Sequence, residues 1–118
     1  MAFPAPSPAR PIRVLIVDDS AFMRRAIERL LTAHPGVQVV GQATDGLDAV
    51  KKALELRPDV ITMDVEMPRM DGVSAVREIM QAVPTPIVMV STLTHEGTET
   101  AIRALEAGAV ECVGKPSG

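Results

Sequence analysis

Carboxylate, hydroxyl and lysine side chains stand at the ends of four short apolar runs in this sequence. They are Asp18, Asp19, Asp64, Ser91, Thr92 and Lys115. Three carboxylates brought together would repel one another and raise each other's pKa values, so a cation must offset their charge. Mg²⁺ meets that need, because it binds oxygen ligands and usually combines one or two carboxylates with waters and a phosphate. A lysine and a hydroxyl can contact further phosphoryl oxygens. The set therefore indicates phosphoryl transfer to an aspartate, in which positioning and charge neutralisation do most of the catalysis.

Each of these residues has an ordinary structural interpretation when it is taken alone. Adjacent aspartates often cap a helix, Ser-Thr pairs often form turns, and a single lysine is usually solvated. The chemical interpretation therefore depends on whether the fold brings them to one place.

Five runs rich in β-branched and aliphatic residues predict five strands. The runs are Ile12–Val17, Val37–Gln42, Val60–Met63, Ile87–Val90 and Val110–Val113. Several are apolar on consecutive residues, which favours strands buried on both faces of a parallel sheet.

Apolar stripes at helical spacing separate the runs and predict four helices. The stripes are Phe22/Met23, Ala26/Ile27 and Leu30/Leu31; Leu47, Val50 and Ala53/Leu54; Val73, Val76, Ile79/Met80 and Val83; and Ala101, Ile102 and Leu105. The alternating order, with right-handed crossovers, predicts an α/β fold with a doubly wound parallel sheet. Such sheets bind ligands at the carboxyl ends of their strands, so the six polar residues should converge on one edge.

Composition narrows the class of protein. The chain has 118 residues, 47 % of them hydrophobic and 23 % charged, which suits one globular domain. A net charge of −3 disfavours nucleic acid as the main ligand. One cysteine excludes an internal disulfide, and the absence of Trp and Tyr disfavours stacking on a flavin or a base. No apolar run suggests a membrane span or a signal peptide, so we expect a cytoplasmic protein. Residues 1–11 are rich in Pro and Ala and are predicted to be a disordered tail, with the domain at 12–118.

The polar residues, taken with their neighbours, resemble the receiver domain of a two-component response regulator. The resemblance rests on Asp18-Asp19, the segment Asp64 to Gly72 (DVEMPRMDG), Ser91-Thr92 and Lys115-Pro116 in that order, and it covers nearly the whole chain. It implies a flavodoxin-like five-stranded sheet of order 2-1-3-4-5, an order that chemotaxis receivers exemplify.

The resemblance also implies roles for individual residues. Asp64 would be phosphorylated by a sensor histidine kinase. Asp19 would ligate Mg²⁺ directly and Asp18 mainly through water, while Asp64 and the backbone carbonyl of Glu66 would complete the protein ligands.

Two more residues would contact the phosphoryl group. Ser91 would move its hydroxyl toward this group, and Lys115 would pair with it. The Lys115–Pro116 peptide bond would be cis, a geometry that is rare outside X-Pro sequences.

Further segments are similar to the chemotaxis protein-glutamate methylesterase. They are Val88 to Thr94 (VMVSTLT), Ala104 to Glu111 (ALEAGAVE) and Lys115 to Gly118 (KPSG). In that family the receiver restrains an attached esterase domain, which removes methyl esters from chemoreceptors, until it is phosphorylated. This chain has no G-x-S-x-G nucleophile motif. It would therefore be the regulatory part alone, a phosphoacceptor and not itself the esterase.

The sequence departs from the receiver pattern in two places. Cys112 stands where receivers usually carry an aromatic residue, and a buried cysteine of this kind is expected to pack as a small hydrophobic residue. The family's fifth helix is missing after Lys115-Pro116, so we expect apolar groups near Val14, Ile16, Val110 and Cys112 to be partly uncovered, and we expect self-association through that face.

The sequence offers three alternatives to this assignment. A haloacid-dehalogenase-like phosphatase also uses an aspartate nucleophile at a strand end, but its metal-binding acids come late in the chain, whereas Asp18-Asp19 comes first. A flavin-binding electron carrier would need a hydroxyl-rich phosphate loop after the first strand and aromatic stacking partners, and this sequence has neither. The third alternative, the receiver of a DNA-binding transcriptional regulator, is not excluded by this sequence.

Overall fold

The computed structural model describes residues 5–92 and 95–116, which form a five-stranded parallel sheet with helices between its strands. The strands are β1 (Ile12–Val17), β2 (Val37–Ala43), β3 (Val60–Asp64), β4 (Ile87–Ser91) and β5 (Glu111–Gly114). The helices are α1 (Ala21–Thr32), α2 (Gly46–Leu56), α3 (Gly72–Ala82) and α4 (His95–Ala107). The strand order is β2-β1-β3-β4-β5, which confirms the predicted topology.

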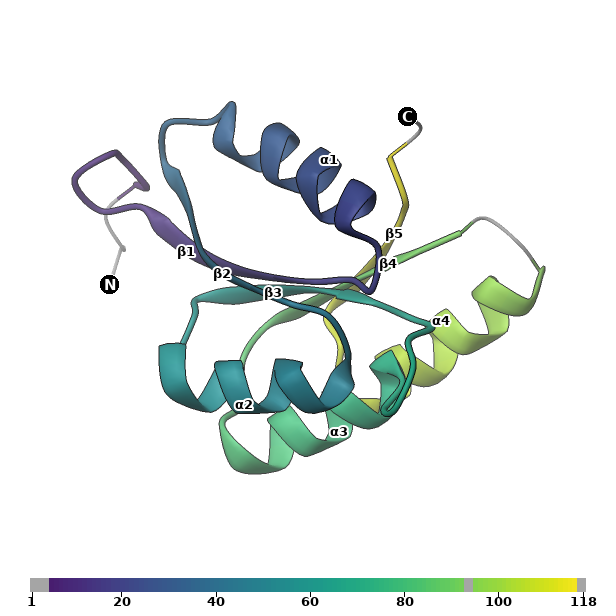
Figure 1. Ribbon diagram of the computed structural model, residues 1–118. Helices are drawn as coiled ribbons and strands as arrows, with labels where there is room; N and C mark the ends of the chain where they lie inside the picture. Colours follow the sequence, from purple (N-terminus) through teal and green to yellow (C-terminus); the bar gives the residue numbers. More distant parts are fainter. Residues whose placement is uncertain (1–4, 93–94, 117–118) are drawn as a thin grey trace.

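The sheet separates two unequal layers of helices. Helix α1 lies on one face, and α2, α3 and α4 lie on the other (Figure 1). The larger core fills the three-helix side, while Val14, Ile16, Ile27 and Val90 form a smaller cluster under α1. The described residues contain no helix after β5, so α1 covers its face alone.

Short polar side chains start three of the helices. Ser20 accepts a hydrogen bond from the backbone N–H of Met23, and Asp45 and Asp71 cap α2 and α3 in the same way. Caps of this type satisfy N–H groups that lack a partner within the helix. Each cap closely follows a strand end or a loop at the carboxyl edge, so the helices begin where the polar residues gather.

Three of the predicted apolar stripes are only half buried, and on α2 the exposed residues are Leu47 and Leu54, at 51 % and 42 %. On α1, Ile27 is buried, whereas Phe22 and Leu30 are each 64 % exposed. A stripe of paired apolar residues covers more of the helix surface than one flat sheet can contact, so one edge of the stripe remains outside. On α4 the alanines face the core, and Ile102 and Leu105 are largely exposed for the same reason.

The uncovered surface differs from the one that the sequence predicts. Val14 and Ile16 are buried, because Ile27 of α1 packs over them. Cys112 packs into the larger core on the opposite side of the sheet. Val110 is exposed but precedes β5, which begins at Glu111.

The apolar surface that is open lies between α1 and β5. It encloses a cavity of about 380 Å³. The residues that line it include Leu30, Val88, Val90, Val113 and Pro116. The prediction of a partly uncovered face is therefore correct in kind, and Val14 does line this cavity, but Ile16, Val110 and Cys112 do not.

The described part of the N-terminal segment forms a tight turn. Ser7 and Arg10 exchange two backbone hydrogen bonds, with N···O distances of 3.2 and 3.0 Å. Residues 1–4 lie outside the described residues, and the disorder of the segment as a whole stays a prediction. Within the described chain, no helix has both the length and the apolar character needed to cross a membrane.

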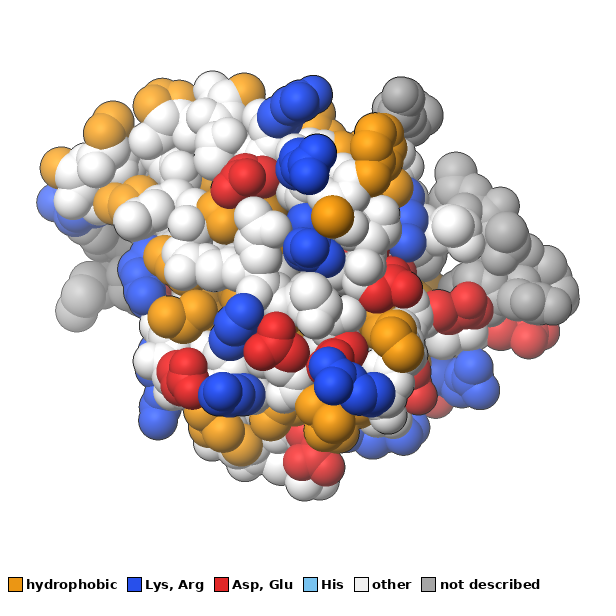
Figure 2. Space-filling model, in the orientation of Figure 1, with side chains coloured by type: hydrophobic (Ala, Val, Ile, Leu, Met, Phe, Trp, Pro, Cys, Tyr) orange, Lys and Arg blue, Asp and Glu red, His pale blue; other side chains and the backbone are white. Residues whose placement is uncertain are grey.

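Surface charge is mixed rather than segregated. On the face in Figure 2, acidic and basic side chains are interspersed, and over α1 basic side chains lie beside apolar ones. This face carries no broad basic surface of the kind that binds a phosphate backbone.

Candidate functional site

Three aspartates meet at the carboxyl edge of the sheet. Strands β1 and β3 are neighbours, with Val17 opposite Met63, so the residues that follow, Asp18 and Asp64, emerge side by side. Asp18 and Asp64 are buried, and Asp19 is exposed. One carboxylate oxygen from each of the three residues lies within 4.8 Å of the others. The predicted convergence of the acids is confirmed.

Lys115 places its ammonium group against the two buried acids. Its Nζ lies 3.1 Å from Oδ1 of Asp64 and 3.6 Å from Oδ2 of Asp18. Strand β5 ends directly before Lys115, and the backbone N–H of Lys115 donates to the carbonyl of Ser91 at 2.9 Å. The sheet therefore positions this lysine through its backbone as well as through its charge.

One prediction at this point is wrong. The described chain contains no cis peptide bond, so the Lys115–Pro116 bond is trans. An X-Pro bond prefers trans by about 0.5–1 kcal/mol unless its surroundings hold the cis form. In the trans form Pro116 lies along the open apolar surface beside Leu30.

Burial and mutual repulsion alter the protonation of the acids. The pKa of Asp64 is raised to about 6, chiefly by burial and next by the charge of Asp18, although Lys115 opposes both effects. Burial also raises the pKa of Asp18. For Lys115, burial alone would lower the pKa, but the hydrogen bond and charge of Asp64 outweigh it, and the pKa is raised.

The donor set fits a small divalent cation. Oδ2 of Asp18 is buried and accepts no hydrogen bond within the described chain, and its contact with Lys115 Nζ is a 3.6 Å ion pair, so this oxygen can still act as a ligand atom next to two other carboxylates. A cavity of about 120 Å³ opens beside these acids. It is lined by Asp19, Asp64, Val65, Glu66, Ser91, Thr92 and Lys115. Carboxylate oxygens with room for water are the surroundings that Mg²⁺ prefers.

Ser91 lies between the cavity and Cys112. The Ser91 hydroxyl is 3.8 Å from Sγ of Cys112 and 3.4 Å from the carbonyl of Thr92. Both contacts are long for hydrogen bonds, so the hydroxyl is weakly held. Cys112 packs against the larger core, as expected for a small hydrophobic residue.

The structure adds one supporting residue that sequence reasoning missed. The guanidinium of Arg24 donates to the carbonyl of Asp18 at 2.8 Å and to the side chain of Gln42 at 3.1 Å. It thus holds the turn that carries Asp18 and Asp19. A signal was available, because helical side chains lean toward the N-terminus and Arg24 lies four residues after the cap Ser20.

The match to a known family covers this site and nearly all of the fold. The family model for the response regulator receiver domain matches residues 14–118. The chain belongs to the response regulator receiver family. The match includes all of the predicted site residues, from Asp18 to Lys115.

Relatives indicate which receivers this domain resembles. It is 60 % identical over 109 residues to the protein-glutamate methylesterase/protein-glutamine glutaminase of Symbiobacterium thermophilum, covering 92 % of this chain and 30 % of the relative. The protein of that name from Pyrococcus abyssi is 50 % identical over 112 residues, covering 95 % and 30 %. The chain thus spans about 30 % of the length of these curated relatives.

Solved structures agree with this assignment. The response regulator domain of Thermotoga maritima CheB has a TM-score of 0.85 and 54 % identity, covering 92 % of this chain and 81 % of that one. A chain in the complex of the CheA3 P1 domain with CheY6 from R. sphaeroides has a TM-score of 0.78 and 39 % identity, covering 92 % and 85 %. The domain is a receiver of the chemotaxis methylesterase type, which supports a place in two-component signalling.

Some residues that carried the resemblance lie outside the described structure. They are Leu93 and Thr94, after β4, and Ser117 and Gly118 at the end of the chain.

Proposed function

We propose that this receiver accepts a phosphoryl group on Asp64 from a sensor histidine kinase, in a reaction that requires Mg²⁺. The observation that carries the proposal is the cluster of Asp18, Asp19 and Asp64 with Lys115 3.1 Å from the Asp64 carboxylate. Ionised carboxylates packed this closely repel one another, so the site needs cationic partners, and Lys115 and a divalent cation would supply them.

Asp64 is the proposed nucleophile. One of its carboxylate oxygens would attack phosphorus and form a new O–P bond. The bond from phosphorus to the kinase histidine would break, the imidazole nitrogen would keep the electron pair, and the ring would then take a proton from water. In a phosphodonor such as acetyl phosphate, the bond that breaks joins phosphorus to the acetate oxygen.

The neighbouring charges prepare Asp64 for this step. Asp18, Asp19, Asp64 and the Glu66 carbonyl would hold Mg²⁺, which, when bound, neutralises charge on the transferring phosphoryl oxygens. Lys115 already contacts Asp64 and would stay beside the phosphoryl group. A nearby cation also favours the ionised form of Asp64, and only that form is nucleophilic.

Ser91 is the proposed sensor of the phosphoryl group. Its hydroxyl lines the same cavity and is held only by long contacts, so it can turn toward a new acceptor at small energetic cost. That movement would take the Ser91 hydroxyl away from the Cys112 thiol and so change the surface near β5.

The proposed output is control of an attached protein-glutamate methylesterase that demethylates chemoreceptors in the cytoplasm. Two relatives at 50–60 % identity carry that activity in their names, and this domain aligns with about 30 % of their length. The receiver of a DNA-binding regulator is the other candidate that the sequence leaves open, but a DNA-binding response regulator of the LuxR family from Staphylococcus aureus is less similar, at 26 % identity. The partners would be a chemotaxis histidine kinase, the esterase domain of the same chain and, indirectly, the chemoreceptors.

Phosphorylation can be tested directly. The chain is incubated with acetyl phosphate and Mg²⁺, and the adduct is followed by intact-mass spectrometry. We expect one phosphoryl group that is stable in acid and labile in base, with none in Asp64→Asn or in EDTA. The control Asp71→Asn changes an exposed carboxylate outside the cluster and should be labelled like the wild type. Equal labelling of wild type and Asp64→Asn would contradict the proposal.

A further inference from the structure

The loop between β3 and α3, residues 65–71, carries Glu66 and borders the acidic cavity. Its two ends are closed on each other, because the N–H of Gly72 donates to the carbonyl of Val65 at 2.9 Å. A Cβ at Gly72 would lie 2.1 Å from the carbonyl oxygen of Asp64, so this closure requires glycine. The base of the loop is therefore fixed, and the position of its tip depends on other contacts.

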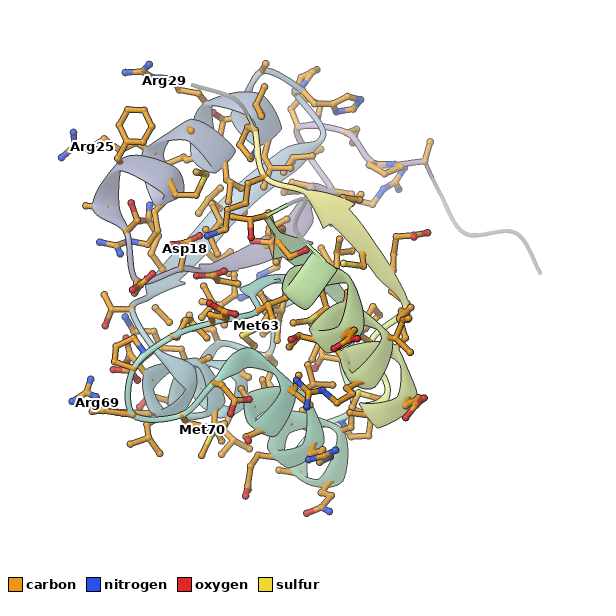
Figure 3. All side chains as sticks on the ribbon, turned by 90° about the vertical axis from the view of Figure 1, so that its right-hand side faces the viewer. Asp18, Arg25, Arg29, Met63, Arg69 and Met70 are labelled. Atoms are coloured by element: carbon orange, nitrogen blue, oxygen red, sulfur yellow. The ribbon has the colours of Figure 1, made fainter. Side chains whose placement is uncertain are left out.

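The tip of the loop is attached to the start of α2. The N–H of Gly46 donates to the carbonyl of Met70 at 2.9 Å, and the Arg69 guanidinium forms an ion pair with Asp45. A Cβ at Gly46 would lie 2.2 Å from the Met70 carbonyl oxygen, so the two segments are as close as glycine allows. Figure 3 shows Arg69 and Met70 beside α2, on the side of the sheet away from α1.

The ion pair joins a buried group to an exposed one. Asp45 has a side chain that is 2 % exposed, whereas that of Arg69 is 65 % exposed. Asp45 also caps α2, since its Oδ1 accepts from the N–H of Asp48 at 2.9 Å. Its Oδ2 receives Arg69. Without Arg69 this oxygen would keep its charge in a buried place and lose the partner that compensates it.

Arg69 also adopts an unfavourable backbone conformation. Its φ is +65°, in the left-handed region that non-glycine residues avoid. Arg57, with φ +48°, is in the same region, but it ends α2, where a left-handed residue is usual. Arg69 ends no helix, so its conformation needs support from elsewhere, and the contact with Asp45 supplies it.

We propose that the Arg69–Asp45 ion pair is a positioning device for the metal site. It holds the 65–71 loop against α2 and so keeps the Glu66 carbonyl beside the three aspartates. Neither residue touches the cavity, so both act through the loop. This inference rests on the proposed function, because it takes the cavity to be the Mg²⁺ site.

The test compares two arginines whose backbone lies in the left-handed region, Arg69 and Arg57. Arg69→Gly and Arg57→Gly both relieve the backbone conformation, but only the first removes the ion pair. Mg²⁺ affinity of the full chain is measured by titration calorimetry. We expect Arg69→Gly to weaken Mg²⁺ binding about tenfold, at the lower end of the range for residues that orient ligands, and Arg57→Gly to bind as the wild type does.

Two further variants exclude a general structural effect. Asp45→Asn keeps the helix cap, because asparagine caps as well as aspartate, and it should weaken Mg²⁺ binding similarly. The double variant should bind no more weakly than either single variant, as for residues that act as a pair. Arg69→Lys should recover part of the affinity. In EDTA, the amide of Gly46 should exchange hydrogen faster in Arg69→Gly than in Arg57→Gly.

The inference would be overturned if Arg69→Gly and Arg57→Gly bound Mg²⁺ equally well, or if the losses in the two single variants were additive. Failure of the wild type itself to bind Mg²⁺ would instead reject the proposed function. The two failures are therefore distinguishable in one set of titrations.

Discussion

Replacing Asp64 by asparagine should stabilise the metal-free domain at neutral pH. Burial, and next the charge of Asp18, raises the pKa of Asp64 from an ordinary 3.8 to about 6. The folded state therefore binds this proton more tightly than the unfolded state does, and the free energy of unfolding decreases as the pH rises from about 4 to 7. At about 1.4 kcal/mol per pH unit, the difference corresponds to roughly 3 kcal/mol.

Part of this gain is offset in the variant. Lys115 donates to Asp64 and loses a charged partner when the carboxylate is removed, although Asp18 remains 3.6 Å from it. We therefore expect a net gain of about 1–3 kcal/mol at pH 7.5, or roughly 4–15 °C in thermal midpoint. Near pH 4, where Asp64 is protonated in the folded state, the gain should be smallest.

Urea unfolding followed by far-UV circular dichroism in EDTA measures this difference. Intrinsic fluorescence is unsuitable, because the chain has no Trp or Tyr. The control is Asp71→Asn, in which the exposed cap of α3 is replaced by an equally good cap. Its stability at pH 7.5 should be close to that of the wild type. The reasoning is refuted if Asp64→Asn is no more stable than the wild type at pH 7.5, or if its gain is the same at pH 4.

Three other results are expected. Mg²⁺ at a hundred times its Kd should raise the free energy of unfolding of the wild type by about 2.7 kcal/mol and so raise its thermal midpoint, and the rise should disappear in Asp19→Ala. A wild-type midpoint that does not change with Mg²⁺ would contradict the metal site. Gly72→Ala should destabilise the domain by about 1–3 kcal/mol in urea unfolding, because the new Cβ would lie 2.1 Å from the Asp64 carbonyl oxygen. Unchanged stability would contradict this, since it would show that the loop adjusts freely. The 118-residue chain should self-associate through the open surface beside α1. In sedimentation velocity Leu30→Glu should reduce this association, whereas Leu54→Glu on the opposite side of the sheet should not. A wild type that is monomeric at all concentrations would contradict this prediction.

The sequence alone determined the order of the elements and the location of the site. Continuous apolar runs such as the one ending at Val17 identify buried parallel strands, because a strand that is covered on both faces needs apolar residues at consecutive positions. Once the strands are parallel, their carboxyl ends must share one edge, so Asp18, Asp64 and Lys115 had to meet. The reasoning needed no knowledge of side-chain contacts.

Only the tertiary structure decided which half of each helical stripe is buried. On α1 the choice between Ile27 and Leu30 depends on how the helix is rotated over the sheet, and that rotation follows from the packing of all its neighbours at once. The choice between Ala104 and Leu105 on α4 has the same origin.

The contacts that support the site also required the folded chain. Arg69 and Asp45 are 24 residues apart in the sequence, and Arg24 and Gln42 are 18 apart. No local pattern distinguishes Arg69 from a solvated arginine, and the position of Arg24 near the start of α1 does not reveal its partner Gln42, because these partners lie on other elements. Their roles arise because the sheet brings the carboxyl ends of β2, β1 and β3 and the starts of the following helices to one edge, where a long side chain can reach another element.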